Sequence, residues 1–187
     1  MPYQPPPELA ELTLAQIAEQ VASRKLPPVE NWDPQKIGES RMRIAADGTW
    51  FHDGSAIKRD AMVRAFSGLL IRDDDGSHHL VSPFEKLSIE VEDAAFIATD
   101  VALRDADQGA SGLAFRLNTD ELIIAGPDHA LIARGEADTP ALYLHVRRGV
   151  EARLNRSTYQ QLADIALAHG DDWSVTSQGE RYSLLPA

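Results

Sequence analysis

The sequence contains no cysteine in its 187 residues. A disulfide framework, thiol catalysis and metal sites with thiolate ligands are therefore excluded together. Aromatic residues make up only 6% of the chain, and no apolar run approaches the roughly 20 residues that a membrane-spanning helix requires. A basic segment followed by an apolar core is also missing from the N-terminus, so we expect a cytoplasmic protein with no membrane partner.

Positive charge is scarce, because 18 Lys and Arg residues face 29 Asp and Glu residues and leave a net charge of −11. A surface of this sign repels nucleic-acid phosphates, so nucleic acid is not an expected partner. Hydrophobic residues make up 43% of the chain and charged residues 25%, which is typical of a folded globular protein. No cofactor is needed to explain its folding, and we expect none.

The N-terminal segment begins with a proline-rich stretch at 1–7 and continues with ELAELTLAQIAEQVASRK, whose apolar residues recur at helical spacing. Thr13 and Gln16 predict a capping box, and Leu12 and Ile17 predict a hydrophobic staple. The apolar stripe of this helix has two interpretations. It packs on the protein's own body, or it contacts a partner, which includes a homodimer through the first 25 residues.

From Arg41 onward the apolar pattern changes to short runs separated by Asp-Gly turns, which predicts antiparallel β hairpins. Two segments break this pattern and predict helices. One is KRDAMVRAFSGLL with Asp60 as N-cap, and the other runs from Ser157, again as N-cap, to about His169. The expected parts are an N-terminal segment at 1–34, a first unit at 35–105 and a second unit at 106–187.

The order of strands, helix and strands occurs twice, and the turn glycines match. Gly48 and Gly149 lie in the hairpins before the two helices, and Gly76 and Gly179 lie in the hairpins after them. Repeated turn and cap residues indicate repeated architecture. We therefore expect an α+β fold of two related units, each with antiparallel β hairpins packed around one helix; the alternative is a chance similarity of short hairpins.

The stretch DGTWFHDGSAIKR holds the first candidate site residues. Its Asp-Gly pairs are typical of hairpin turns, because Gly accepts a positive φ and Asp tolerates one. In the strand between them Trp50 and His52 share one face, and Phe51 is expected in the core. Trp50 and His52 are then either half-buried sheet residues or one wall of a ligand site that stacks a flat ring.

Lys58 and Arg59 precede a helix N-terminus, whose partial positive charge disfavours cations by roughly 0.3–1 kcal/mol. Arg156 repeats this arrangement before the second helix, and Arg153 lies on the same strand face nearby. Either carboxylates of the chain pair with these cations, or an external phosphate or carboxylate does. The second interpretation predicts an anionic small molecule as partner.

Metal and acid-base sites have little support in the sequence. His78 and His79 would point to opposite faces of a strand, and the run at 73–76 lacks the alternating ligands of a calcium loop. No P-loop, dinucleotide fingerprint or nucleophile elbow occurs. An enzyme would have to rely on acid-base groups, of which the candidates are Glu85, Asp93 and His52.

Five stretches together resemble a known bacterial family, the domain of unknown function 1285. In order they are DGTWFHDGSAIKR, LVSPFEKLSIEVEDAAF, FRLN, VRRGVEARLNRSTY and Trp173-Ser174. The resemblance extends from about Trp32 to Trp173. The tail SVTSQGERYSLL departs from it, since the family usually ends in a Gly-rich strand that contains Phe.

This resemblance implies two related domains, the second similar to a pleckstrin-homology fold, with a site for a nucleotide-like ligand at their interface and a role in signalling. It defines no catalytic residue. Arg59, Arg116 and Asn118 match its motifs and serve either packing or binding.

We therefore expect a ligand-binding or regulatory protein with an anionic, nucleotide-like ligand in a cleft between its units. The alternative is a protein-interaction module that uses the N-terminal helix or an exposed strand edge, and an acid-base enzyme is the third hypothesis. The expected site residues are Trp50, His52, Lys58, Arg59, Arg116, Asn118, Arg153 and Arg156.

Overall fold

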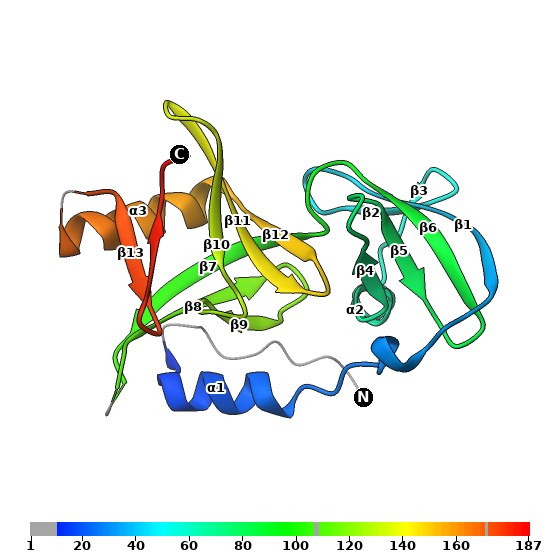
Figure 1. Cartoon of the computed structure of the whole chain (residues 1–187), viewed down its shortest axis with the longest axis horizontal. Coiled ribbons are helices and arrows are strands. Elements are labelled where there is room, and N and C mark those ends of the chain that lie inside the picture. Colours follow the sequence, from blue (N-terminus) through cyan, green and yellow to red (C-terminus); the bar gives the residue numbers. More distant parts are fainter. Residues whose placement is uncertain (1–10, 107–108, 171) are drawn as a thin grey trace. The chain divides into compact units, whose positions relative to one another are not determined.

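The computed structural model describes residues 11–106, 109–170 and 172–187, so the proline-rich stretch at 1–7 lies outside the described part (Figure 1). Contacts divide the chain into two compact units. Unit 1 contains the described residues up to Arg24 together with Ile97–His145 and Ala152–Ala187, and unit 2 contains Lys25–Phe96 and Val146–Glu151. Both units are discontinuous in sequence, whereas three consecutive ranges were expected above. Unit 2 holds most of the expected first unit (35–105), and unit 1 holds most of the expected second unit (106–187).

Unit 2 contains a six-stranded mixed sheet in the order β3-β2-β1-β6-β5-β4. Its strands are β1 (Lys36–Ile44), β2 (Trp50–His52), β3 (Ser55–Ala56), β4 (Leu70–Arg72), β5 (His78–Val81) and β6 (Glu85–Val91). The central pair β1–β6 is parallel, and its register shifts between Glu39 and Arg43. Arg41 takes a φ of 57° at this irregularity.

Helix α2 (Asp60–Ser67) packs on this sheet through an aromatic contact. Trp50 of β2 is only 2% exposed, and its ring stacks on Phe66 at 6.4 Å between centroids. Such burial contributes roughly 1.5–3 kcal/mol for each large apolar side chain. The expected N-cap was wrong by one residue: Arg59 is the N-cap and supplies no side-chain hydrogen bond, and Asp60 is the first helical residue.

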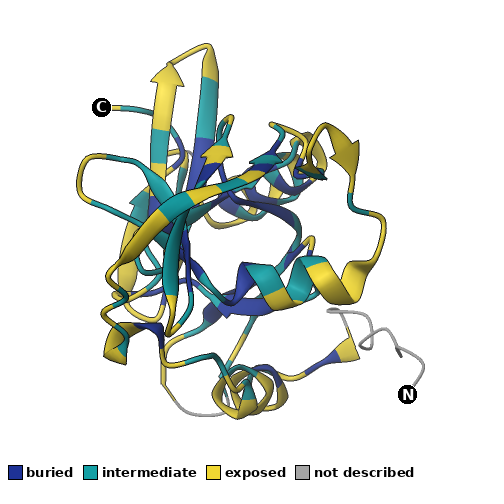
Figure 2. Cartoon of the chain, turned by 90° about the vertical axis from the view of Figure 1, so that its right-hand side faces the viewer, coloured by how far each residue is buried: buried dark blue, intermediate teal, exposed yellow. Residues whose placement is uncertain are grey.

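Unit 1 contains a six-stranded sheet in the order β10-β11-β12-β7-β8-β9 and a separate hairpin of β13 and β14. The strands are β7 (Phe96–Arg104), β8 (Gly112–Leu117), β9 (Leu122–Ile124), β10 (Leu131–Glu136), β11 (Thr139–Arg147), β12 (Val150–Leu154), β13 (Ser174–Ser177) and β14 (Glu180–Ser183). Buried and half-buried residues alternate along β12, as the period of two requires, and Figure 2 colours the whole chain by burial.

Helix α1 (Leu14–Ser23) forms with the predicted capping box. The Gln16 amide donates to Thr13 Oγ1 at 3.2 Å, and the Thr13 amide donates to Gln16 Oε1 at 2.9 Å. Ile17 and Leu12 are buried with Ala114 of β8 in one cluster, and Figure 1 shows α1 beside β8 and β9. The apolar stripe of this helix therefore packs on the protein's own body.

Helix α3 (Arg156–His169) follows β12, and its capping differs from the expectation. Asn155, not Ser157, is the N-cap, because Asn155 Oδ1 accepts a hydrogen bond from the Thr158 amide at 2.8 Å. Asn is one of the most favourable N-cap residues because its side-chain oxygen reaches the free amides of the first turn. The buried face of the helix consists of Thr158, Leu162, Ala163 and Ala166.

The two sheets have the same strand order, which supports the expected duplication. From one edge, each sheet presents the third, second, first, sixth, fifth and fourth strand of its own unit. All four turn glycines aligned above have a φ between 76° and 88°. The helices do not correspond so simply, because α2 lies between the third and fourth strands and α3 follows the sixth. Unit 1 also contains α1, so one helix per unit is not confirmed.

Candidate functional site

The four expected site residues of unit 2 lie around β2 and the start of α2. Trp50 is a core residue whose indole is stacked and buried, whereas His52 is exposed and lies 3.5 Å from the Asp53 carboxylate. Phe51 was expected in the core, but it is half-buried and carries the Arg43 guanidinium 4.4 Å above its ring. The cation–π contact keeps this ring at the surface.

Lys58 and Arg59 are exposed and adjacent at the start of α2. Neither forms an ion pair with another residue in the described part of the chain. A carboxylate of the chain is therefore not their partner there, and the expected external anion stays a prediction. Trp50 faces the core, so it does not form one surface with these two cations.

The other four expected residues lie in unit 1. Asn118 has a structural role, since its Oδ1 accepts from the Ile97 amide at 3.1 Å and its own amide donates to the Ile97 carbonyl at 2.8 Å. Arg153 donates to the Tyr143 hydroxyl at 3.4 Å, and its guanidinium lies 5.5 Å from the ring centroid. Arg156 is exposed on the first turn of α3, and Arg116 is half-buried on β8.

A pocket of about 570 Å³ lies within unit 2, away from these eight residues. This volume is within the range of small-molecule sites. Val81 and Lys86 are register partners on neighbouring strands, so their side chains emerge on the same face of the sheet. The lining residues are Val29, Glu30, Trp32, Asp33, Pro34, Ile71, Arg72, Asp74, Val81, Lys86, Arg148 and Gly149.

Local geometry brings the segment Val146–Glu151 to this pocket. The Arg72 amide donates to the Arg148 carbonyl at 3.0 Å. Gly149 follows with a φ of 76°, and a Cβ at this position would lie 2.8 Å from the Arg72 carbonyl oxygen. Glycine is therefore required here both by its backbone conformation and by the close approach of β4.

The Arg148 guanidinium is held by two backbone carbonyls, one at the end of α2 and one just before the 3₁₀ helix η2 (Val29–Asn31). Arg148 Nη1 donates to the Gly68 carbonyl at 2.8 Å, and Nη2 donates to the Pro27 carbonyl at 2.7 Å. Gly68 is the C-cap of α2, where carbonyl groups lack helical partners and favour a cation. Two fixed acceptors therefore hold this charge in one place.

Glu30 neutralises Arg148 from the solvent side. Arg148 Nε donates to Glu30 Oε1, yet the Glu30 side chain is 62% exposed and that of Arg148 only 11%. The hydrogen bond from Arg148 lowers the pKa of Glu30 below its ordinary value. The cation is thus buried and rigidly held, while its counter-ion is an exposed side chain.

The lining of the pocket contains a second cation that is held by an ion pair, Lys86. Lys86 Nζ lies 2.8 Å from Asp73 Oδ2, and His79 Nδ1 lies 3.0 Å from the same oxygen. Arg72 Nη1 lies 3.5 Å from Glu151 Oε1.

Cations and carboxylates balance along the lining, and this distinguishes the pocket from the chain as a whole. Three cations, Arg72, Lys86 and Arg148, face three carboxylates, Glu30, Asp33 and Asp74, whereas the whole chain carries a charge of −11. Asp73 and Glu151, which do not line the pocket, add two carboxylates beside Lys86 and Arg72.

The sequence-based hypotheses missed this pocket. Trp32, Lys86 and Arg148 come from stretches that are far apart along the chain. None of them lies just before the N-terminus of a helix, where an anion site was expected from the sequence. The sequence did contain a signal. The stretches LVSPFEK and VRRG, which belong to the motifs of the family resemblance, both contribute lining residues. Among the described residues, no group of three or more His, Asp or Glu side chains could hold a metal ion, and no helix is long and apolar enough to span a membrane.

Comparisons with known proteins identify relatives of the chain. The profile described as domain of unknown function (DUF1285), N-terminal domain, matches residues 27–94, and the profile of the DUF1285 C-terminal domain matches 95–184. The crystal structure of a DUF1285 family protein from Silicibacter pomeroyi DSS-3 is 37% identical over 92% of this chain and 94% of its own, with a TM-score of 0.75.

A DUF1285 family protein from Shewanella baltica OS155 is 23% identical over 66% of this chain and 90% of its own, with a TM-score of 0.52. At this identity the likeness shows the fold alone. No curated protein matches the chain.

Proposed function

The chain belongs to the DUF1285 family, and from its geometry we propose that it is a ligand-binding, regulatory protein whose ligand is a small anion with a flat ring, such as a nucleotide. The observation that carries this proposal is the convergence of Trp32, Lys86 and Arg148 on one pocket of unit 2. An aromatic surface and fixed cations are the two features that such a ligand requires.

The cation at Arg148 supports the proposal through its rigidity. Its guanidinium is fixed by two carbonyl oxygens, so little conformational entropy is lost when an anion binds its Nε–H. Glu30 occupies this donor in the absence of ligand, and an exposed carboxylate can turn away into solvent. A phosphate or carboxylate of the ligand then takes the position of the Glu30 carboxylate.

Trp32 supports the aromatic part of the proposal. Its indole is half-buried in the pocket lining, and the Trp32 amide is fixed by a hydrogen bond to the Val29 carbonyl at 3.1 Å. A partly covered aromatic face on a fixed backbone offers a stacking surface for a planar ring.

The experiment is a thermal-shift screen with mononucleotides, dinucleotides and inorganic pyrophosphate, followed by calorimetric titration of the compound that raises the melting temperature most. Lys86→Gln should weaken binding of that compound about tenfold, because a charge-assisted contact is lost. Lys36→Gln is the matched control, since Lys36 pairs with Glu85 outside the pocket lining and its side chain is 75% exposed.

Trp32→Phe and Trp173→Phe form a second matched pair, since Trp173 does not line this pocket. Only the first should weaken binding. If no compound raised the melting temperature, or if both lysine variants bound equally, the proposal would be refuted.

A protein-interaction module is the second candidate, and one observation favours it. Phe84 is 81% exposed and Ile37 is 67% exposed, near the starts of two strands that pair Lys36 with Glu85. The double variant Phe84→Ser with Ile37→Ser should then abolish a homodimer detected by native mass spectrometry. Leu167→Ser is the control, because Leu167 is 50% exposed on α3.

Two further features belong to this proposal. For unit 1 we propose the likeness to a pleckstrin-homology fold, supported by a sheet whose last strand is followed along the chain by α3. Superposition on such a domain with α3 at a different end of the sheet would refute it.

We also propose a cytoplasmic location, which agrees with the lack of cysteine. Recovery of the protein in a periplasmic fraction would contradict this.

A further inference from the structure

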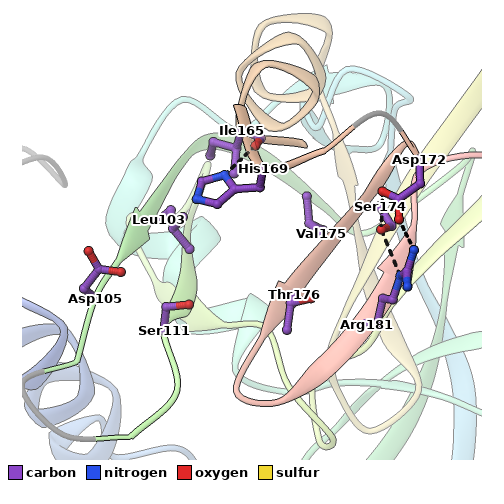
Figure 3. A pocket seen from close by; sticks show the side chains of 10 residues that line it. All are labelled: Leu103, Asp105, Ser111, Ile165, His169, Asp172, Ser174, Val175, Thr176 and Arg181. Atoms are coloured by element: carbon purple, nitrogen blue, oxygen red, sulfur yellow. Dashed lines mark hydrogen bonds and ion pairs between the residues drawn. The ribbon is translucent and has the colours of Figure 1, made fainter. Parts of the chain in front are cut away.

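Unit 1 contains a pocket that the proposed function does not use. It has a volume of about 430 Å³ and lies between the end of β7, the C-terminal end of α3 and strand β13 (Figure 3). Three of its lining residues are apolar, namely Leu103, Ile165 and Val175, the last of which is only 5% exposed. An organic molecule with an apolar portion therefore has a surface on which to pack.

At one end of the pocket, three polar side chains form hydrogen bonds and an ion pair with one another. Arg181 Nε donates to Ser174 Oγ at 3.0 Å, Ser174 Oγ donates to Asp172 Oδ1 at 2.8 Å, and Arg181 also pairs with Asp172 (Figure 3). The hydrogen bond from Ser174 lowers the pKa of Asp172, so this carboxylate stays ionised beside the guanidinium. The charges of the two side chains cancel, and Arg181 is engaged.

The other end offers hydrogen-bond acceptors. His169 Nδ1 lies 2.8 Å from the Ile165 carbonyl, and because a carbonyl only accepts, Nδ1 carries a proton and donates to it. This hydrogen bond holds the imidazole against the last turn of α3. Asp105 is exposed at this end and forms no ion pair with any residue that the structure describes. Figure 3 shows Asp105, Leu103 and His169 together on the side away from the network.

The C-terminal end of α3 adds to the negative potential of this end. The helix has 14 residues and ends at His169, and the partial negative charge of a helix C-terminus favours cations. Asp105 and the helix end therefore both favour a positive group, and the apolar side chain of Leu103 lines the same pocket.

We propose that this pocket of unit 1 binds an organic cation, an amine carried on a short apolar body. The ammonium group donates to the Asp105 carboxylate, and the hydrocarbon part covers Leu103 and Val175. The site is separate from the anion pocket of unit 2, and it does not depend on the function proposed there.

The test compares hexylamine with hexanol by calorimetric titration of the full chain. Hexylamine should bind and hexanol should not, because only the amine carries the charge. Asp105→Asn should weaken hexylamine binding about five- to tenfold. Asp138→Asn is the matched control, since it removes one exposed carboxylate of unit 1 outside the pocket and should leave the affinity within about twofold.

Three outcomes would overturn the proposal. They are no binding of hexylamine, equal binding of hexanol, and equal weakening of binding by both Asp variants, as general attraction to a chain of charge −11 requires. Asp105 is exposed, so Asp105→Asn should retain the melting temperature of the parent. Lys86→Gln should leave hexylamine binding unchanged, which separates this result from the test of the anion pocket.

Discussion

Replacing Glu30 by Gln tests whether this carboxylate occupies the place of the ligand's anion. The variant keeps the size of the side chain and removes the charge that neutralises Arg148. Because the Glu30 side chain is 62% exposed, the ion pair contributes at the level of surface pairs, about 0.2–1 kcal/mol. Glu30→Gln should therefore lower the free energy of unfolding by no more than about 1 kcal/mol.

The same substitution should strengthen ligand binding. A ligand anion no longer has to displace a carboxylate from Arg148 Nε, so the energy of the lost pair appears as affinity, about two- to fivefold. Calorimetric titration of the anion found in the screen measures this change, and urea unfolding measures the stability. An unchanged or lower affinity in Glu30→Gln would refute the idea that Glu30 competes with the ligand.

The pH dependence of stability gives an independent check on the Glu30–Arg148 pair. The pKa of Glu30 is lowered from its ordinary value of 4.5 in the folded protein, first by the hydrogen bond from Arg148. A lowered pKa stabilises the folded state at every pH above the pKa of the unfolded state. This stabilisation is lost as the pH falls through the pKa of the folded state. The stability difference between the parent and Glu30→Gln should therefore be constant near pH 7 and shrink below about pH 4.5.

Two further predictions concern the backbone around the pocket and the helix starts. Gly149→Ala should destabilise unit 2 by roughly 1–3 kcal/mol more than Gly179→Ala in urea unfolding, because both residues have a positive φ but only Gly149 has a backbone atom within 3 Å of the added Cβ; equal losses would show that Arg72 can move aside. Asn155→Ala should cost about 1 kcal/mol through the lost N-cap, whereas Arg59→Ala should be nearly neutral, since its side chain makes no cap hydrogen bond; a large effect at Arg59 would contradict the cap assignment.

Helix α1 was predictable from sequence because its signals are local. Thr13 and Gln16 are three residues apart, so the capping box is formed by neighbours whatever the rest of the chain does. The same holds for the hairpin turns at Gly48, Gly76 and Gly179, where a positive φ is intrinsic to the turn. Local chemistry of this kind is visible in a single sequence.

Helix starts show where this local reasoning becomes unreliable. Asp60 and Ser157 are both good N-cap types, yet the N-cap is Arg59, one residue earlier, in α2 and Asn155, two residues earlier, in α3. The choice between neighbouring capping residues depends on where the preceding strand ends, and strand ends are decided by pairing with distant residues.

The sequence by itself determined that this protein has two hairpin-rich units, no thiol chemistry and an acidic surface, because composition, turn residues and helical periods act over a few neighbouring residues. Only the tertiary structure decided which cations line a pocket. Trp32, Lys86 and Arg148 converge because a register pairs Val81 with Lys86 and because Gly149 allows Arg148 to reach the end of α2. Such contacts depend on long-range packing, which local patterns do not encode.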